Sequence, residues 1–313
     1  MSVEYYTVTA NEAGQRIDNF LLKYFKKVPK SVIYRIVRKG EVRVDKKRVK
    51  PEYKLAEGEQ IRIPPVRTEL EQPRASEASE QLLERIDQAI LHEDTHIIVV
   101  NKPAGLPVHG GSGVPFGLIE AFRQLRPNLP FVELVHRLDK DTSGLVMLAK
   151  SRPALTALHQ MLKDGAIEKH YKALVHGRWQ GGKRHITLDL KRENNSYQKM
   201  QVAEEDEEGQ TAESIFKPIS AYGDCTLMDV QILTGRMHQI RVQLAHLGYP
   251  ILGDERYGDF KLNREYREVG VKRLCLHAAS LACYFELSGQ KLQFEAPLPE
   301  DINQVLKALK GQK

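Results

Sequence analysis

Two short stretches near the N-terminus of the chain have the apolar spacing of amphipathic helices. Residues 16–25 and residues 31–39 each place apolar side chains three and four positions apart. These apolar positions are Ile17, Phe20, Leu21 and Tyr24 in the first stretch, and Val32, Ile33, Ile36 and Val37 in the second. Gly40 follows the second stretch, where a residue that is free to adopt positive φ is favoured. The pattern predicts two short helices, the second ending at Gly40.

After these helices, apolar and polar side chains alternate in the manner of short strands. The alternation is present around residues 41–44 and again around residues 61–63. Helices and strands together predict a small α+β domain over residues 14–67, preceded by an N-terminal extension at residues 1–13. Residues 68–88 are polar and charged, which is typical of a linker that passes into a short helix.

A second, larger domain is predicted over residues 89–313. Its strand-like runs lie at residues 97–100, 145–149, 171–175, 227–233 and 292–296, and its clearest helical stretches at 154–163, 238–247 and 301–310. Strands outnumber helices, and strand and helix do not alternate regularly. We therefore expect an α+β fold with a mixed, largely antiparallel sheet and flanking helices, rather than a doubly wound parallel sheet.

The composition is that of an ordinary globular protein, with 41% hydrophobic and 28% charged residues. No apolar run approaches the roughly 20 residues needed to span a bilayer, so no membrane partner is expected. The first residues lack the basic and apolar regions of a secretory signal. Cys225, Cys275 and Cys283 form no CxxC pair, which argues against a disulfide framework or a cysteine-based zinc site. These features predict a cytoplasmic protein.

The positive charge of the chain is concentrated in the small N-terminal domain. Residues 14–67 hold 16 Lys and Arg against 6 Asp and Glu, a net charge of +10. The whole chain carries +6, so the remainder carries −4. A concentrated basic domain is expected of a protein that contacts the phosphates of a nucleic acid. A charge excess alone, however, is more typical of an ordinary solvated surface.

The order of elements in this domain resembles the S4 RNA-binding domain. RIDNFL opens the first helix and KGEVRVDKKRVKPEYKL follows the second, so the likeness covers about one sixth of the chain. The resemblance implies that the second helix and the loop after it lie against RNA. The basic residues implied as RNA contacts are Lys30, Arg35, Arg38, Lys39, Lys46, Lys47 and Arg48. A generic basic pair of helices is the alternative.

Residues 92–96, HEDTH, match the HExxH pattern of zinc proteases. That pattern requires a helix, which places both histidines on one face. Asp94 and Thr95 are poor helix formers and a strand-like run follows at once, so we interpret the segment as a turn that enters a strand. The glycine-rich residues 105–113 lack the spacings of nucleotide-binding loops, and no GxSxG motif is present. No metal and no cofactor is expected.

Four segments of the second domain carry its remaining chemistry. HRLDKDTSG (136–144) places an aspartate between two cations at a turn, which alone fits a structural Asx turn equally well. The other segments are NKPAGLPVHGGSG (101–113), KHYKALVHG (169–177) and TGRMHQIRVQLAHLGYPILGDERYG (234–258). In this order they resemble the bacterial family of pseudouridine synthases that includes the enzymes for 23S ribosomal RNA. The resemblance covers nearly the whole second domain and implies that uridines of 23S ribosomal RNA are isomerised to pseudouridine.

The resemblance also implies roles for individual side chains. It makes Asp139 the catalytic carboxylate, and it places Tyr171 against the target base, where it assists removal of a proton. Arg241 lies on the apolar side of a predicted helix, and a buried arginine requires a carboxylate partner. The family pattern supplies Asp139 as that partner, kept ionised by the guanidinium. Arg137 fills the space that the target base leaves when it is flipped out of its stack.

Several alternatives stay open. Types C and D of the family both carry an S4 domain, and the VHGGSG segment favours type C over a type D enzyme with other target uridines. A non-catalytic S4 RNA-binding assembly factor would share the basic domain but would not need Asp139, Tyr171 and Arg241 together. A metal hydrolase built on HEDTH would lose activity in the presence of a chelator. We expect a monomer, and the sequence favours neither a covalent nor an elimination mechanism.

Overall fold

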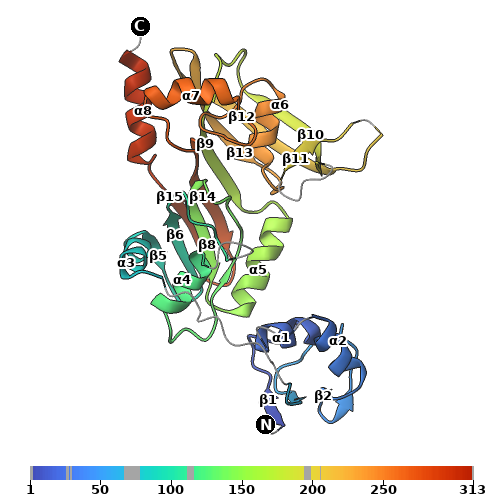
Figure 1. Ribbon diagram of the computed structural model, residues 1–313. Coiled ribbons are helices and arrows are strands. Elements are labelled where there is room, and N and C mark those ends of the chain that lie inside the picture. Colours follow the sequence, from blue (N-terminus) through green and yellow to red (C-terminus); the bar gives the residue numbers. More distant parts are fainter. Residues whose placement is uncertain are drawn as a thin grey trace.

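In the computed structural model, the chain forms a small N-terminal domain and a large domain built on one extended sheet (Figure 1). The structure describes residues 3–25, 28, 30–66, 78–110, 116–193, 199–204 and 206–311. Part of the predicted linker, and residues 111–113 of the VHGGSG segment, lie outside these ranges. Within the described ranges, no helix is long and apolar enough to cross a membrane.

The small domain contains both predicted helices and a four-stranded sheet. Its elements are β1 (Glu4–Thr7), α1 (Ile17–Tyr24), α2 (Lys30–Arg38), β2 (Arg43–Val44), β3 (Lys47–Arg48) and β4 (Gln60–Ile63), and the strand order is β1-β4-β2-β3. Apolar residues of both helices and of β2 and β4 share one core. Gly40 has a φ of +72°, which confirms the predicted helix end. β1 comes from the segment predicted as an extension and pairs with β4.

The large sheet has eleven strands, in the order β11-β10-β12-β13-β9-β14-β8-β6-β5, with β15 beside β14 and β7 beside β8. These are β5 (Ile90–Glu93), β6 (Ile97–Lys102), β7 (Glu133–Leu134), β8 (Ser143–Ala149), β9 (Glu168–His176), β10 (Arg184–Arg192), β11 (Met200–Val202), β12 (Gln210–Tyr222), β13 (Cys225–Ile232), β14 (Leu276–Phe285) and β15 (Gln290–Glu295). Among the described strands, every pairing in this sheet is antiparallel except β8 with β14. The predicted mixed, largely antiparallel α+β fold is confirmed.

Six helices are described in this domain. They are α3 (Glu80–Gln88), α4 (Leu118–Leu125), α5 (Arg152–Lys163), α6 (Gln239–His246), α7 (Phe260–Glu268) and α8 (Glu300–Gly311). Apart from single residues at their ends, the strands and helices predicted for this domain fall on observed elements. Apolar periodicity was therefore a sufficient signal for these elements.

Strands β6 and β8 supply apolar side chains to two cores. Ile98 and Val146 belong to the larger core, which α3, α4 and α8 help to close, whereas Val99 and Met147 belong to a second core beneath α5. Alternate residues of a strand point to opposite faces of the sheet, so a core lies on each face. All seven residues of β8 are buried as a result.

The parallel junction of β8 and β14 places the start of β8 in a crowded position. Gly144, which has a φ of +112°, is paired with Ala278. A Cβ atom at position 144 would lie 2.2 Å from the carbonyl oxygen of Ala278. Only glycine accommodates both this conformation and this approach. The close junction fixes the point at which the preceding loop enters the sheet.

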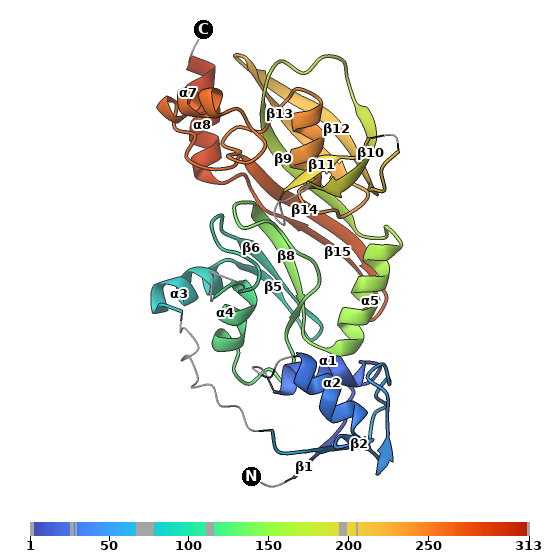
Figure 2. The same cartoon turned by 45° about the vertical axis from the view of Figure 1, so that its right-hand side comes forward.

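The small domain contacts the large one near α5, as both views show (Figure 2). The backbone and guanidinium of Arg152, at the start of α5, bond to Asn11 and Gln15. Lys23 of α1 forms an ion pair of 2.5 Å with Glu133 of β7. These contacts join the small domain to elements that lie immediately before and after the loop and strand of residues 135–149.

Candidate active site

Asp139 lies in the loop that joins β7 to β8. The loop closes as a turn, in which the backbone N–H of Thr142 donates to the carbonyl of Asp139 over 3.2 Å. Thr142 is buried, whereas the side chain of Asp139 remains 18% exposed. The turn therefore holds one carboxylate at the end of a fully buried strand, where it can be reached from outside.

Arg241 of α6 binds this carboxylate and a second one. Its Nη1 donates to Oδ2 of Asp139 over 2.9 Å, and its Nε and Nη2 donate to the two oxygens of Asp254 over 2.8 and 2.9 Å. Burial alone would lower the pKa of Arg241, but Asp254 and then Asp139 raise it above its ordinary value. The guanidinium stays charged and is held in a fixed orientation by the bidentate pair. The structure thus brings two of the predicted catalytic residues, Asp139 and Arg241, into direct contact.

Asp254 is a site residue that the sequence reasoning did not single out. Its side chain is 1% exposed, and Oδ1 also accepts the backbone N–H groups of Arg256 and Tyr257, each over 3.0 Å. Burial raises the pKa of this carboxyl, but the hydrogen bond and charge of Arg241 outweigh burial and lower it overall. The signal was present in the GDERYG end of the fourth motif, although nothing in the spacing indicated a partner for Arg241.

Tyr171 lies in β9, between β13 and β14, and is 7% exposed. Its side chain lines the same cavity as Asp139. Burial, and after it the charge of Asp139, raise the pKa of Tyr171 far above its ordinary value. At neutral pH the residue therefore presents a neutral phenol beside the carboxylate.

His238 lies beside Asp139, Tyr257 lies against His238, and the sequence reasoning named neither. Nε2 of His238 lies 3.7 Å from Oδ2 of Asp139, and Nδ1 lies 2.7 Å from the hydroxyl of Tyr257. Arg241 lies over the ring of Tyr257, 5.0 Å from its centroid. Both residues belong to the fourth motif, within MHQIR and DERYG, but their contact depends on the fold.

Two adjoining cavities open around these residues. One has a volume of about 270 Å³ and includes Tyr171 and Ile232 in its wall. The other has a volume of about 630 Å³ and includes Lys140, Lys272 and Arg273. The two cavities share Arg137, Leu138, Asp139, His238 and Arg241. Arg137 is exposed at this shared wall, so it lies where a side chain could enter or leave the site.

Lys102 is bonded to the loop that carries Asp139, and the sequence reasoning did not single it out either. Its side chain is fully buried, and Nζ donates to the carbonyls of Pro103, Leu106 and Lys140 over 3.0, 2.8 and 3.1 Å. Burial lowers the pKa of this lysine to about 7. Since three carbonyls match the three N–H groups of an ammonium, Lys102 ties the NKPAG segment to the turn that carries Asp139.

The seven basic residues predicted to bind RNA lie on the small domain, whereas Asp139 lies in the loop before β8 of the large domain (Figure 1 shows the two domains). All seven are exposed, and none forms an ion pair with a carboxylate of the described residues. Asp45 and Lys46 have φ values of +46° and +66°, as a two-residue hairpin turn requires. Lys46 lies in that turn, and Lys47 and Arg48 follow it in β3.

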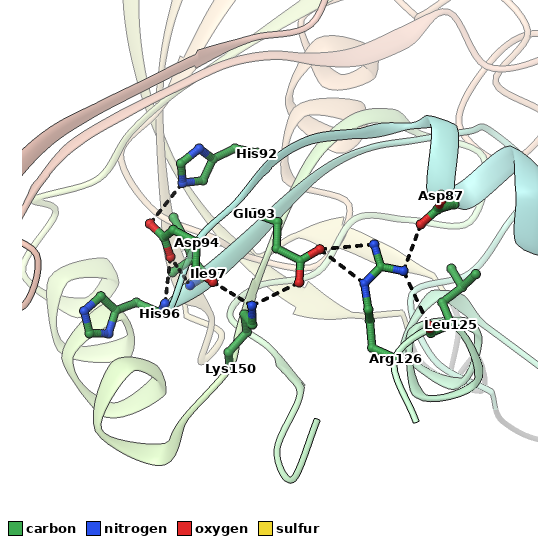
Figure 3. Close-up of polar contacts among 9 residues, drawn as sticks. All are labelled: Asp87, His92, Glu93, Asp94, His96, Ile97, Leu125, Arg126 and Lys150. Atoms are coloured by element: carbon green, nitrogen blue, oxygen red, sulfur yellow. Dashed lines mark hydrogen bonds and ion pairs between the residues drawn. The ribbon is translucent and has the colours of Figure 1, made fainter. Parts of the chain in front are cut away.

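The HEDTH segment is a turn between β5 and β6, as the sequence predicted (Figure 3). The carboxylate of Asp94 accepts the backbone N–H groups of His96 and Ile97, each over 2.7 Å, and contacts the ring of His92 at 3.0 Å. The rings of His92 and His96 pack against different aromatic residues, Phe294 and Phe285. The helix that a zinc protease needs for this motif is replaced by the end of β5 and the turn that leads into β6.

Comparison with known proteins assigns families to both domains. The family described as RNA pseudouridylate synthase matches residues 96–246, and the S4 domain matches residues 15–61. The first range contains Asp139, Tyr171 and Arg241, and the second contains all seven basic residues of the small domain.

The chain is also similar to curated proteins over nearly its full length. It is 46% identical over 312 residues to "Ribosomal large subunit pseudouridine synthase C" of Escherichia coli (strain K12), covering 99% of this chain and 98% of the relative. The protein of the same name in Yersinia pestis is 47% identical over 309 residues, covering 98% and 96%. Among solved structures, "Human RNA Pseudouridylate Synthase Domain Containing 4" is similar with a TM-score of 0.62 and 25% identity, covering 74% of this chain and 96% of that one.

Proposed function

The chain belongs to the family of RNA pseudouridylate synthases, and we propose that the uridines it isomerises lie in the 23S RNA of the large ribosomal subunit. Relatives with nearly half of their residues identical, matched over the small domain as well as the large one, carry the name of large-subunit enzymes of type C. Type C specificity is therefore the assignment we favour, with type D specificity for other uridines as the second candidate. We further propose that the enzyme acts as a monomer in the cytoplasm.

The reaction sets definite demands on the site. The bond between N1 of uracil and C1′ of ribose breaks, the base turns, and a bond forms between C5 and C1′. The proton on C5 is lost and N1 gains one, so atoms and electrons balance within the substrate. The site must therefore bind an extruded nucleotide, stabilise the sugar while it is detached from the base, and move one proton.

The observation that carries the proposal is the 2.9 Å contact between Arg241 and Asp139 in the wall of an open cavity. Arg241 donates to Oδ2 of Asp139 and leaves Oδ1 to face the substrate. Asp254 keeps the guanidinium in place from the other side. A carboxylate held in this way is suited to act as a nucleophile. Attack at C1′, attack at the ring and elimination from the sugar all use it in the same position.

Tyr171 is proposed to pack against the target base and to receive the C5 proton or pass it on. A neutral phenol can take up a proton only as it gives its own away, and the raised pKa of Tyr171 makes that loss costly while Asp139 is charged, because burial and then the charge of Asp139 cause the shift. A covalent bond from Asp139 to the substrate would remove that charge. The proton transfer is therefore easier after the carboxylate has reacted than before.

RNA binding is proposed to use two surfaces. The exposed basic residues of the small domain hold the backbone of the RNA. Arg137, at the shared wall of the two cavities, fills the space that the flipped uridine leaves in its stack. A non-catalytic assembly factor would need the first surface only, so the built carboxylate site favours an enzyme.

The test is to compare the wild-type protein with Asp139→Asn on 23S RNA from a strain that lacks the gene. We expect the wild type to introduce pseudouridine at a small set of positions and the variant to introduce none. Mapping of pseudouridine along the RNA distinguishes type C from type D. Equal pseudouridine formation by both proteins would overturn the role of Asp139, and modification of other RNAs only would overturn the 23S assignment.

A further inference from the structure

The backbone of His238 is held in an uncommon conformation beside the catalytic carboxylate. Its φ of +54° and ψ of +21° place it in the left-handed region immediately before α6. Within the described part of the chain, only Asp45 and Lys46 share a positive φ among non-glycine residues, and their hairpin turn requires it. His238 is the third residue of a turn in which the backbone N–H of Gln239 donates to the carbonyl of Arg236 over 3.3 Å, and a positive φ fits that position. This turn sets where the imidazole lies at the start of α6.

The hydrogen bonds around the imidazole decide which of its nitrogens carries the proton. The backbone N–H of Met200 donates to the hydroxyl oxygen of Tyr257 over 2.8 Å. The single proton of that hydroxyl is then directed at Nδ1 of His238, 2.7 Å away. We therefore assign Nδ1 as the acceptor, which leaves the proton of a neutral imidazole on Nε2.

The imidazole is neutral under ordinary conditions. Burial lowers the pKa of His238 to about 4. Asp139 and Asp254 act against this shift, whereas Arg241 and Arg256 add to it. Near neutral pH the side chain is thus an uncharged donor through Nε2 rather than a cation.

Among the residues that the structure describes, no acceptor is recorded within hydrogen-bond distance of Nε2. The nearest acceptor, Oδ2 of Asp139, is 3.7 Å away, which is too long for a hydrogen bond, and Arg241 already donates to that oxygen. The side chain of His238 is 10% exposed and lies in the wall that the two cavities share. A fixed, uncharged donor therefore faces the space that the substrate enters.

Resting on the function proposed above, we infer that His238 donates a hydrogen bond through Nε2 to the 2′ oxygen of the target ribose. When the carboxylate of Asp139 meets C1′, the 2′ oxygen sits on the adjacent carbon, within reach of a donor 3.7 Å from that carboxylate. The other neighbour of C1′, the ring ether oxygen, is a weaker acceptor. The 2′-hydroxyl is also the group that distinguishes RNA from DNA. His238 is then a specificity-determining residue, and Tyr257 is a positioning residue that fixes its tautomer.

Two substitutions of His238 test the contributions of Nδ1 and Nε2 separately. His238→Asn tolerates the left-handed backbone and keeps a group near Tyr257, but it is too short to replace Nε2. His238→Gln places an amide N–H near the position of Nε2. On an RNA that the wild type modifies, the single-turnover rate of the Asn variant should fall about tenfold or more, as for one lost hydrogen bond, and the Gln variant should recover part of it.

The decisive measurement combines these variants with a 2′-deoxyuridine at the target position. The deoxy substrate should slow the wild type about tenfold and should slow His238→Asn much less, because the contact is already lost. Equal slowing of both proteins would overturn the inference. If the wild type modified other RNAs but not 23S RNA, the proposed substrate would be wrong. The inference about His238 would still be testable, because any RNA that the enzyme modifies serves in this comparison.

The tautomer is tested without activity. Nitrogen NMR of the imidazole should show the proton on Nε2 between pH 6 and 8 in the wild type and a mixture of tautomers in Tyr257→Phe. That variant should be slower at saturating RNA, with RNA affinity unchanged. Tyr249→Phe is the matched control, because its hydroxyl accepts from Gln180 outside the cavities, and it should keep the wild-type rate. A proton on Nδ1, or a charged ring at pH 7, would overturn the inference.

Discussion

Nη1 of Arg241 lies 2.9 Å from Oδ2 of Asp139, although 102 positions separate the two residues in the sequence. The contact joins α6 to the loop before β8 and leaves the second oxygen of the carboxylate for the substrate. The other edge of the guanidinium is held by Asp254, which is almost fully buried. On the proposed mechanism, reactivity depends on Asp139 and folding on Asp254, and substitutions should separate the two effects.

Asp139→Asn should abolish activity with little effect on folding. The substitution keeps the shape of the side chain but removes the nucleophilic charge, so pseudouridine formation should fall by at least about three orders of magnitude. Arg241 keeps its bidentate pair with Asp254 in this variant, and the melting temperature should change by no more than a few degrees. Pseudouridine is measured on a uridine-containing transcript, and unfolding by circular dichroism. A variant that keeps a tenth of the wild-type rate would rule out a nucleophilic role.

Asp254→Asn should destabilise the fold. It leaves the buried guanidinium of Arg241 with Asp139 as its remaining carboxylate, and breaking a buried pair of this kind costs about 3 kcal/mol. The matched control is Glu255→Gln, which removes an ion pair with Arg267 at an exposed position and should cost less than about 1 kcal/mol. Urea unfolding of the wild type and the two variants measures both losses of unfolding free energy. Equal losses would contradict the burial of the pair between Arg241 and Asp254.

The contribution of Asp254 should also depend on pH in a defined direction. Arg241 lowers the pKa of this carboxyl below its ordinary value of 3.8, so its stabilisation is complete above that value and is lost as the pH falls through the lower, folded value. The difference in unfolding free energy between wild type and Asp254→Asn should be constant from pH 7 to about 5 and should shrink below about pH 4. A difference that grows on acidification would contradict the lowered pKa.

Tyr171→Phe should separate chemistry from packing. Phenylalanine fills the same space between β13 and β14, so unfolding and RNA binding should stay close to those of the wild type. The rate of product formation at saturating RNA should fall by about two orders of magnitude or more, since the group that moves the proton is lost. A rate within twofold of the wild type would make Tyr171 a packing residue only.

Removal of three positive charges from the β2–β3 hairpin should weaken RNA binding without changing the rate of the chemical step. In the triple variant Lys46→Ala, Lys47→Ala and Arg48→Ala, the slope of log affinity against log salt should fall by about 2 to 3, because each phosphate contact contributes slightly less than one. The rate at saturating RNA should be retained. A charge-matched triple variant of Lys163, Lys183 and Lys307 should leave the slope nearly unchanged. If both triple variants lowered the slope equally, the hairpin would contribute only its general charge and no specific phosphate contacts.

The sequence predicted well those features that depend on local pattern. The helices α2 and α6, and the strands around Val146 and Tyr171, follow from apolar periodicity, which is a property of neighbouring residues. The assignment of Asp139, Tyr171 and Arg241 to one site came from motif resemblance. The structure brings them around one cavity. Their catalytic roles stay predictions until the substitutions above are measured.

What the sequence did not reveal are partners that only the folded chain brings together. Asp254 and Tyr257 stand in a quoted motif, yet their contacts with Arg241 and His238 depend on where α6 begins and how the loop after it returns. Lys102 is charged and by type belongs at the surface, but three carbonyls provide a buried position for it. Such sites depend on backbone groups, which no side-chain pattern records.

The complete burial of β8 has a kinetic consequence for the loop that it anchors. Amide protons of a central strand between two cores exchange with solvent only when the whole domain opens. Asp139 is four residues from the start of that strand, so the anchor of its loop shares the slowest fluctuations of the molecule. The orientation of the carboxylate thus depends on the stability of the whole domain, while Arg137, two residues earlier, is exposed.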